Sequence, residues 1–113
     1  ELSLEINLDG LVATNTTINR SNLNTSDQEL SDIGAGGLSG KPLKKASDEV
    51  LLYLTKNLQN KVPVIGVGGI HSAKDARDKI NAGASAVQLY TGFIYEGPAL
   101  VKKIAQELTN NLN

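Results

Sequence analysis

The sequence predicts an α/β fold of three strand–helix units with parallel strands, a partial (β/α)8 TIM barrel. Short apolar runs alternate with segments of helical periodicity, and parallel strands need such crossovers. An open doubly wound sheet shares this alternation, but each run here ends in polar or glycine residues, as barrel strands do. A full barrel needs about 250 residues, and the chain has 113. Two strand edges should therefore stay open and invite association.

The composition argues against several classes of function. Twelve acidic and eleven basic residues give a net charge of −1 without a basic face, so no nucleic-acid partner is expected. The absence of cysteine excludes disulfide and thiolate chemistry. No apolar run approaches the roughly 18 residues of a membrane-spanning helix. The chain begins at Glu1 in a helix-like segment without a targeting sequence, and we therefore expect a fragment.

The first unit opens with the tail of a helix at residues 2–6, followed by a strand at Leu11–Ala13 and the polar run Thr14–Thr17. Residues 19–45 are rich in Ser, Asn, Asp and Gly, which predicts a loop. Connections this long are usually functional or disordered. A helix should then begin with Ser47 as its N-cap. Its apolar stripe is expected at Val50, Leu51, Leu54 and Leu58.

The second unit has its strand at Val62–Ile65, a β-branched run typical of a strand buried on both faces. The glycine-rich run Gly66–Gly69 should end this strand. Ser72 then caps a helix, and Asp75 completes a capping-box pattern. Gly83 is placed to stop that helix at its C′ position.

The third unit has its strand at Ala86–Tyr90, broken by Thr91–Gly92. A short helical turn is expected at residues 93–96. The last helix should start at Pro98, where the missing N–H does no harm. Its apolar stripe is expected at Leu100, Ile104, Leu108 and Leu112, with Val101 and Ala105 alongside.

The run Gly66–Gly69 lacks the G-x-G-x-x-G spacing of dinucleotide-binding proteins. It is either a tight corner that needs positive φ or a place where backbone N–H groups approach an anion. Because Tyr90–Gly92 ends the neighbouring strand in a similar way, we favour a phosphate site made by both corners.

Two other polar runs permit more than one interpretation. Thr14–Thr17 is either a turn or a set of groups that contacts both edges of a planar polar ring, for which Asn15 has donors and an acceptor. Gly36–Lys41 is either a flexible loop or a segment that folds over a ligand. His71, the single histidine, is expected on the surface. No metal site and no catalytic residue can be assigned.

Four runs cover nearly the whole chain: Asp9–Thr17, Gly36–Leu43, Pro63–Ile70 and Ala82–Pro98. In order and spacing they resemble dihydroorotate dehydrogenase, most of all its class 2, quinone-dependent branch. The resemblance implies that residues 1–113 are the C-terminal part of a single FMN-binding (β/α)8 barrel domain, its last three units. The N-terminal part of that domain would then be absent.

The resemblance also implies roles for seven residues. The positions that contact FMN are Thr14, Gly40, Gly69, Tyr90 and Thr91, of which the last three hold its phosphate. The positions that bind dihydroorotate or orotate are Asn15 and Thr16. The family's catalytic base, a serine, and a lysine near the flavin lie upstream of these residues, so no catalytic residue is expected here.

The implied reaction is the oxidation of dihydroorotate to orotate with a quinone as electron acceptor, in pyrimidine biosynthesis. The chain alone is expected to be inactive. Membrane contact would belong to an absent N-terminal extension, at the cytoplasmic face of a bacterial inner membrane or at the mitochondrial inner membrane. Two alternatives stay open. One is another phosphate-binding barrel enzyme, such as a sugar-phosphate isomerase or a relative of inosine-monophosphate dehydrogenase, and the other is a non-enzymatic half-barrel binding module.

Overall fold

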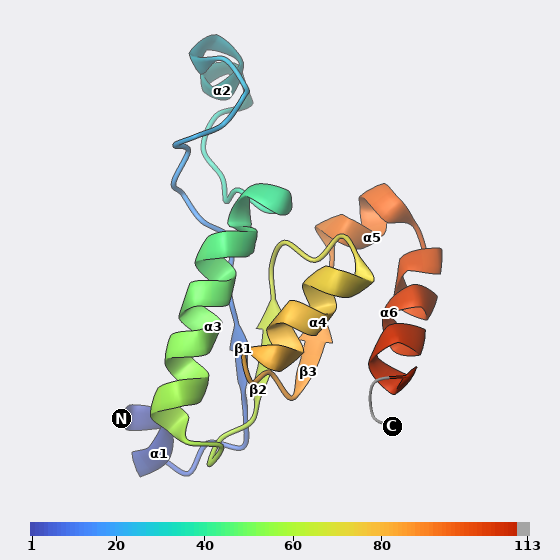
Figure 1. Ribbon diagram of the computed structural model, residues 1–113. Helices are drawn as coiled ribbons and strands as arrows, with labels where there is room; N and C mark the ends of the chain where they lie inside the picture. Colours follow the sequence, from blue (N-terminus) through green and yellow to red (C-terminus); the bar gives the residue numbers. More distant parts are fainter. Residues whose placement is uncertain (111–113) are drawn as a thin grey trace.

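The computed structural model describes residues 1–110 (Figure 1). Three parallel strands form one sheet in the order β1 (Leu11–Ala13), β2 (Val64–Val67) and β3 (Ala86–Gln88). Strands that follow one another in the chain are neighbours in the sheet, as they are in a (β/α)8 barrel. The predicted α/β fold with three parallel strand–helix units is confirmed.

Helices cover one face of this sheet. Helices α3 (Lys44–Leu58) and α4 (Ala73–Asn81) lie across it, and α6 (Ala99–Asn110) packs beside α4 (Figure 1). On the opposite face the side chain of Val12 is 60% exposed. The register aligns Val12, Ile65 and Ala86 across the three strands.

The core consists of two aliphatic clusters, because the chain has few aromatic residues. The first joins α3 to the sheet and contains Ala13, Leu51, Leu58, Val62, Val64 and Ala84. The second joins α4 to α6 and contains Ile70, Ala76, Leu100 and Ile104. Burial of apolar surface at about 25 cal/mol per Å² is what holds the helices on the sheet.

Helix α3 begins earlier than predicted. A 3-10 turn, η1 (Lys41–Leu43), leads directly into it at Lys44, so Ser47 is not the N-cap. Ser47 lies buried inside the helix and faces the sheet. The prediction of an apolar stripe was right for the three leucines and wrong for Val50, which is 45% exposed.

The segment predicted as a long loop contains a helix, α2 (Asp27–Ile33), and the prediction was wrong there. Ser26 Oγ accepts a hydrogen bond from the Glu29 N–H at 3.3 Å, and the Glu29 carboxylate accepts one from the Ser26 N–H at 3.1 Å. This capping box starts the helix, and the Ser26 hydroxyl and N–H lower the pKa of Glu29. Helix α2 stands at the end of an arm, away from the sheet (Figure 1).

The remaining boundaries differ little from the predictions. Strand β2 continues to Val67, so Gly66 lies inside the strand instead of ending it. Strand β3 stops at Gln88, before the expected end at Tyr90. Helices α1 (Leu2–Glu5) and α5 (Thr91–Glu96) stand where helical segments were expected.

Helices α4 and α6 agree with their predicted starts. Ser72 Oγ accepts from the Asp75 N–H at 3.1 Å and caps α4, and Gly83 follows its C-cap with φ +101°. In α6 the predicted flanking residues Val101 and Ala105 are exposed, while Leu112 lies outside the described residues. None of the helices within residues 1–110 combines the length and apolar character needed to cross a membrane.

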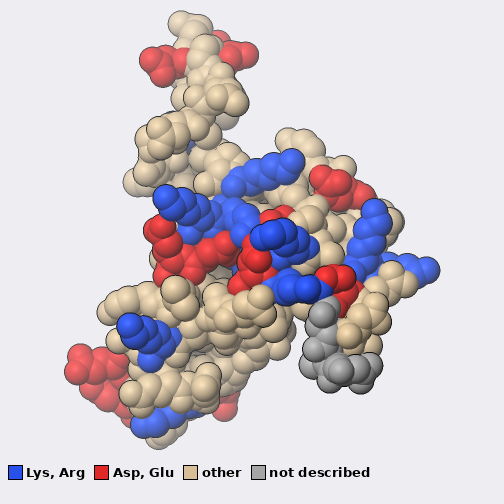
Figure 2. All heavy atoms as spheres, in the orientation of Figure 1, with Lys and Arg blue, Asp and Glu red and all other residues tan. Residues whose placement is uncertain are grey.

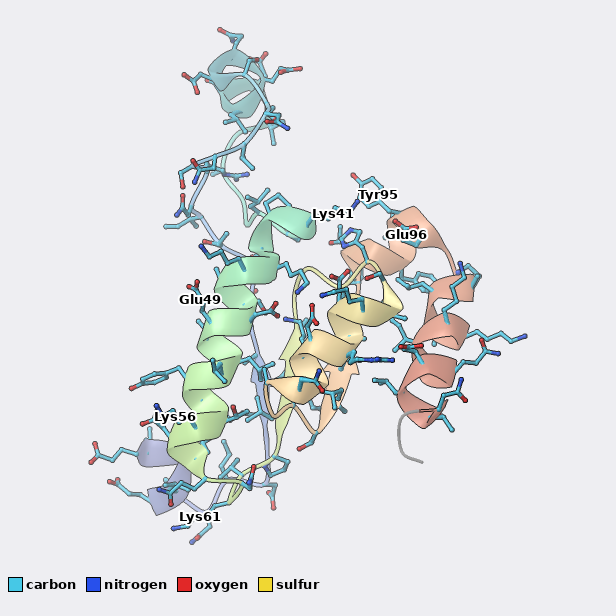
Figure 3. The ribbon with its side chains drawn as sticks, in the orientation of Figure 1. Lys41, Glu49, Lys56, Lys61, Tyr95 and Glu96 are labelled. Carbon is cyan, nitrogen blue, oxygen red and sulfur yellow. The ribbon has the colours of Figure 1, made fainter. Side chains whose placement is uncertain are left out.

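Charged side chains gather on the outer side of the helical layer. Figure 2 shows basic and acidic groups interleaved over α3 and α4. In Figure 3, Glu49, Lys56 and Lys61 project from α3 and the following loop, away from the sheet. These three side chains are exposed and belong to a solvated outer surface.

Candidate functional site

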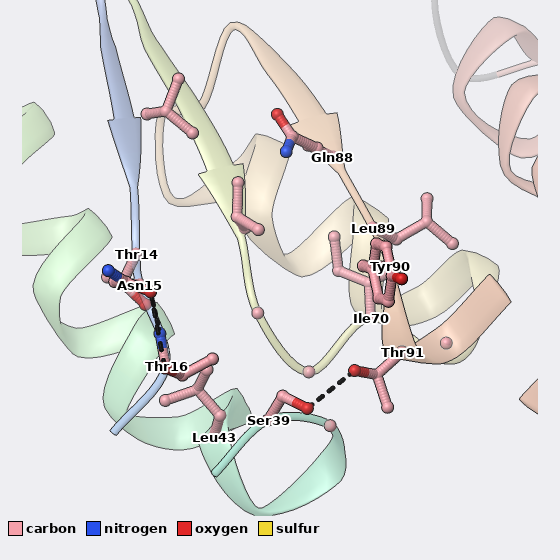
Figure 4. Close-up of a pocket in the computed structure, with 16 residues that line it drawn as sticks. Thr14, Asn15, Thr16, Ser39, Leu43, Ile70, Gln88, Leu89, Tyr90 and Thr91 are labelled. Carbon is pink, nitrogen blue, oxygen red and sulfur yellow. Dashed lines mark hydrogen bonds between the residues drawn. The ribbon is translucent and has the colours of Figure 1, made fainter. Parts of the chain in front are cut away.

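A cavity of about 570 Å³ lies at the carboxyl ends of the three strands (Figure 4). Its walls come from the end of β1, the loop before α3, and the corners that follow β2 and β3. Its volume is within the range of pockets that hold small molecules and cofactors. All seven residues singled out from the sequence line it: Thr14, Asn15, Thr16, Gly40, Gly69, Tyr90 and Thr91.

Thr14 anchors the wall that continues from β1. Its N–H donates to the Val67 carbonyl at 3.0 Å, which extends the pairing of β1 with β2 by one step. Its hydroxyl oxygen is buried and has no hydrogen-bond partner among residues 1–110. Buried polar atoms nearly always have a partner, so this hydroxyl is suited to a hydrogen bond with a ligand.

Asn15 and Thr16 form the polar rim of the same wall. The Asn15 Oδ1 accepts from the Thr16 N–H at 2.8 Å and lies 3.5 Å from the Thr16 Oγ1 (Figure 4). The Asn15 NH₂ group donates no hydrogen bond within residues 1–110, so both of its hydrogens are available to a partner. Such a group fits the carbonyl or carboxylate oxygens of a small polar ring.

The loop before α3 closes the cavity from a second side. Thr17 and Leu38 exchange two backbone hydrogen bonds, of 2.7 and 3.1 Å, which hold this loop against the segment after β1. The hydroxyls of Ser39 and Thr91 are 2.8 Å apart and share a hydrogen bond (Figure 4). Gly40 has φ +81°, and a Cβ atom there would lie 3.1 Å from the Thr91 methyl carbon.

Sequence reasoning did not assign Ser39 a role, although it precedes Gly40 in the run that suggested a loop over a ligand. The structure brings that run to the cavity, which favours the second interpretation of the loop. Its last residue, Lys41, is exposed and lines a neighbouring cavity of about 530 Å³ instead.

The corners after β2 and β3 supply a wall of bare backbone. Gly69 has φ +72°, and a Cβ atom there would overlap the backbone of Lys44. A Cβ atom on Gly92 would overlap the carbonyl oxygen of Ile70, so the two corners touch each other. The tight-corner interpretation is therefore correct, and it does not exclude an anion, because bare backbone amides are what such a site offers.

A buried polar cluster lies behind the β2 corner. The Lys79 side chain is 0% exposed, and its Nζ donates to Asp48 Oδ1 at 2.7 Å and to Ser47 Oγ at 2.9 Å. Lys44 Nζ holds the other oxygen of Asp48, at 2.7 Å. Asp48 therefore joins a fully buried cation to a partly exposed one.

Lys44 extends this cluster to α4 through Asp78, 3.1 Å away. Burial by itself lowers the pKa of Lys44, but hydrogen bonds and charge from Asp48 and Asp78 outweigh it and raise the pKa. A hydrogen bond from Lys74 lowers the pKa of Asp78 against its desolvation, and Lys44 adds to the effect. Lys44 and Asp78 are thus each stabilised in their charged forms.

His71 lies outside the main cavity. The expectation of a surface side chain was wrong in part, because the ring is half-buried and its Nδ1 has no partner among the described residues. Its backbone N–H donates to Asp75 at 3.0 Å, and its ring centre is 6.1 Å from that of Tyr95. Through its backbone N–H, His71 therefore takes part in capping the N-terminus of α4.

The chain is similar to proteins of known activity. A family model described as dihydroorotate dehydrogenase matches residues 1–112. A dihydroorotate dehydrogenase (quinone) from Christiangramia forsetii is 53% identical over 108 residues, which cover 96% of this chain and 31% of that protein. The enzyme of that name from Idiomarina loihiensis is 52% identical over 105 residues, 93% of this chain and 30% of that protein.

Solved structures of DHODH are similar to this chain as well. The crystal structure of ligand-free DHODH from Eimeria tenella has a TM-score of 0.86 and 44% identity, covering 99% of this chain and 30% of that chain. A second structure of the Eimeria tenella protein, in complex with ferulenol, has the same TM-score and identity. The chain therefore spans about three tenths of the length of the relatives it matches.

Proposed function

The chain belongs to the dihydroorotate dehydrogenase family, and we propose on that premise that it forms part of a quinone-dependent enzyme of pyrimidine biosynthesis. This enzyme oxidises dihydroorotate to orotate and uses FMN as its cofactor. Residues 1–113 are the C-terminal part of a single FMN-binding barrel domain. The observation that carries this proposal is the convergence of all seven predicted site residues on one cavity at the strand ends.

The residues of the cavity fit FMN in three respects. The buried hydroxyl of Thr14 lacks a partner within residues 1–110, the volume of about 570 Å³ suits a cofactor, and two corners offer bare backbone. Thr14 and Gly40 would contact the flavin, and Gly69, Tyr90 and Thr91 would hold its phosphate. When bound, FMN supplies the redox chemistry, taking a hydride from the substrate and passing electrons to the quinone.

Asn15 and Thr16 bind and orient the pyrimidine in this proposal. The Asn15 NH₂ group has both hydrogens available, because Thr16 occupies the amide oxygen. It can donate to a carbonyl or to the carboxylate of dihydroorotate, while the Thr16 hydroxyl serves as donor or acceptor. No residue of this chain is given the part of the base, which lies outside residues 1–113.

The rest of the protein would complete the barrel against the open edges of β1 and β3. A quinone dissolves in lipid, so the enzyme acts at the surface of an inner membrane, which it reaches through an N-terminal extension beyond this chain. That membrane is the bacterial one, at its cytoplasmic face, or the mitochondrial one.

The family match across residues 1–112 favours this function over another phosphate-binding barrel enzyme. A binding module without activity is distinguished by experiment. The full-length protein that carries this chain should show flavin absorbance and dihydroorotate-dependent reduction of a quinone, whereas residues 1–113 alone should show no turnover. A full-length protein without flavin, or turnover by residues 1–113 alone, would contradict the proposal.

A pair of variants tests the substrate assignment. Asn15→Ala in the full-length enzyme should raise KM for dihydroorotate by about 10- to 150-fold, since a hydrogen bond to a charged group contributes about 1.5–3 kcal/mol. Asn81→Ala, at the far end of α4, is the matched control and should leave KM unchanged. Equal KM values for the two variants would remove Asn15 from the substrate site.

A further inference from the structure

A buried series of hydrogen bonds ends on the backbone at the corner after β2, Gly68–Gly69, which in the proposed function holds the phosphate. Lys79 Nζ donates to Ser47 Oγ at 2.9 Å, and Ser47 is 1% exposed. The Ser47 hydroxyl in turn donates to the Val67 carbonyl. The same carbonyl accepts the Thr14 N–H at 3.0 Å. One carbonyl at the end of β2 is thus held from β1 and from α3 together.

The donor and acceptor of each hydrogen bond between Lys79, Ser47 and Val67 follow from the chemistry of these groups. An ammonium group only donates, so the Ser47 oxygen must accept from Lys79, and the single Ser47 hydrogen is left for Val67. Asp48 holds Lys79 in place through a 2.7 Å contact, and Lys44 occupies the second oxygen of Asp48. Lys79 therefore fixes which way the Ser47 hydroxyl points.

The absence of side chains at Gly66 and Gly68 lets Lys79 and Ser47 approach the backbone of the glycine run. A Cβ atom on Gly66 would lie 3.0 Å from Lys79 Cδ, and one on Gly68 would lie 3.0 Å from Ser47 Oγ. A side chain at position 66 or 68 would therefore occupy the space that Lys79 and Ser47 fill. The run Gly66–Gly69, which resembles an anion-binding motif, also makes room for the buried side chain of Lys79.

A lysine in this position needs an explanation beyond packing. Burying a charge is costly even when it is paired, and an apolar residue of similar volume is often as stable or more stable. The hydrogen bonds of Lys79 lead to the one peptide unit that joins β2 to the corner lined by Gly68 and Gly69. Within that planar unit, the direction of the Val67 carbonyl sets the direction of the Gly68 N–H.

We propose that Lys79 and Ser47 are positioning residues that fix the Val67–Gly68 peptide so that the corner after β2 is preorganised for a phosphate. The inference rests on the proposed function, since FMN is the molecule that brings the phosphate. Neither residue touches the ligand. Both act through the backbone, and their effect is confined to the phosphate end of the cofactor.

Riboflavin, which lacks the phosphate of FMN, separates this role from a general effect on the fold. In the full-length protein, Ser47→Ala should weaken FMN binding about fivefold, the effect of one hydrogen bond of about 1 kcal/mol, and leave riboflavin binding unchanged. Lys79→Met should reduce the ratio of the two affinities in the same way, because it frees the Ser47 hydroxyl to turn. Flavin fluorescence gives both affinities, and the ³¹P shift of bound FMN should change in both variants.

Thr55→Ala is the matched control. The Thr55 hydroxyl donates to the Ala82 carbonyl at 2.6 Å, a hydroxyl-to-carbonyl bond like that of Ser47, but made from α3 to the C-cap residue of α4. It should lower the melting temperature and leave the FMN-to-riboflavin ratio at the wild-type value.

The outcomes separate the two proposals. If the wild-type protein binds FMN no better than riboflavin, the phosphate site fails, and the positioning role fails with it. If the wild-type protein discriminates and Ser47→Ala discriminates equally well with an unchanged ³¹P shift, only the positioning role is overturned. Ser47→Ala decides the question even if Lys79→Met does not fold, because it removes one oxygen atom and leaves Asp48 paired to Lys79.

Discussion

Substituting Gly69 by alanine tests the geometry of the corner after β2 directly. Gly69 has φ +72°, and an added Cβ would overlap the backbone of Lys44 at the start of α3. A left-handed conformation costs a non-glycine residue about 1–2 kcal/mol, and overpacking against a fixed neighbour costs about 1–3 kcal/mol. Together these effects predict that Gly69→Ala lowers the free energy of unfolding by about 2–5 kcal/mol.

Two other glycines separate the contributions. Gly97 has φ +75° and ψ −177° with no atom within 4 Å of an added Cβ, so Gly97→Ala should cost only the conformational part, about 1–3 kcal/mol. Gly36 has neither restriction, and Gly36→Ala should stay within about 0.5 kcal/mol of wild type. Urea unfolding of the three variants, followed by circular dichroism and fitted with a common m value, gives the differences in the free energy of unfolding. Equal losses for Gly69→Ala and Gly97→Ala would refute the close approach of α3 to the corner.

Two further predictions concern single side chains. Thr14→Val removes the buried hydroxyl that lacks a partner within residues 1–110. It should leave the melting temperature equal or higher, yet weaken FMN binding about fivefold. Tighter flavin binding in a titration would contradict the assignment of Thr14. Asp78 has a lowered pKa, so its stabilising effect is present above its ordinary value of 3.8 and is lost as the pH falls through the lower folded value. Asp78→Asn should therefore cost under about 1 kcal/mol at neutral pH, with a difference from wild type that disappears in acid; a difference that grows in acid would reverse the sign of this linkage.

The strands and corners could be predicted from the sequence because their causes are local. A β-branched run, a Ser72 cap and a Gly83 stop each depend on residues within a few positions. The same reasoning failed at Ser47, whose tendency to cap helices was overridden by a tertiary contact with the Val67 carbonyl. Helix α2 was missed although Ser26 and Glu29 carry the capping-box pattern, because the surrounding composition resembles that of a loop.

The candidate site was predictable only in part for a similar reason. The tight corner after β2 was predicted from its glycines, and Gly68 and Gly69 have the positive φ that such a corner needs. No local rule places Gly40 and Ser39 beside Thr91, 52 positions further along from Ser39; that closure was expected from the family resemblance. Lys79 was not predicted to be buried, since lysine in a helix is normally solvated and its partners Asp48 and Ser47 lie on another helix.

The short contacts of Gly66 bear on how this sequence can change over generations. A larger residue at position 66 would meet Lys79 Cδ at 3.0 Å, Leu51 at 3.1 Å and Ala84 at 3.3 Å. Accepting it would require a shorter residue at position 79, which would leave Asp48 with one cation fewer. Substitutions at these positions are therefore expected to arise together or not at all, and an alignment of related chains should show them as a co-varying set.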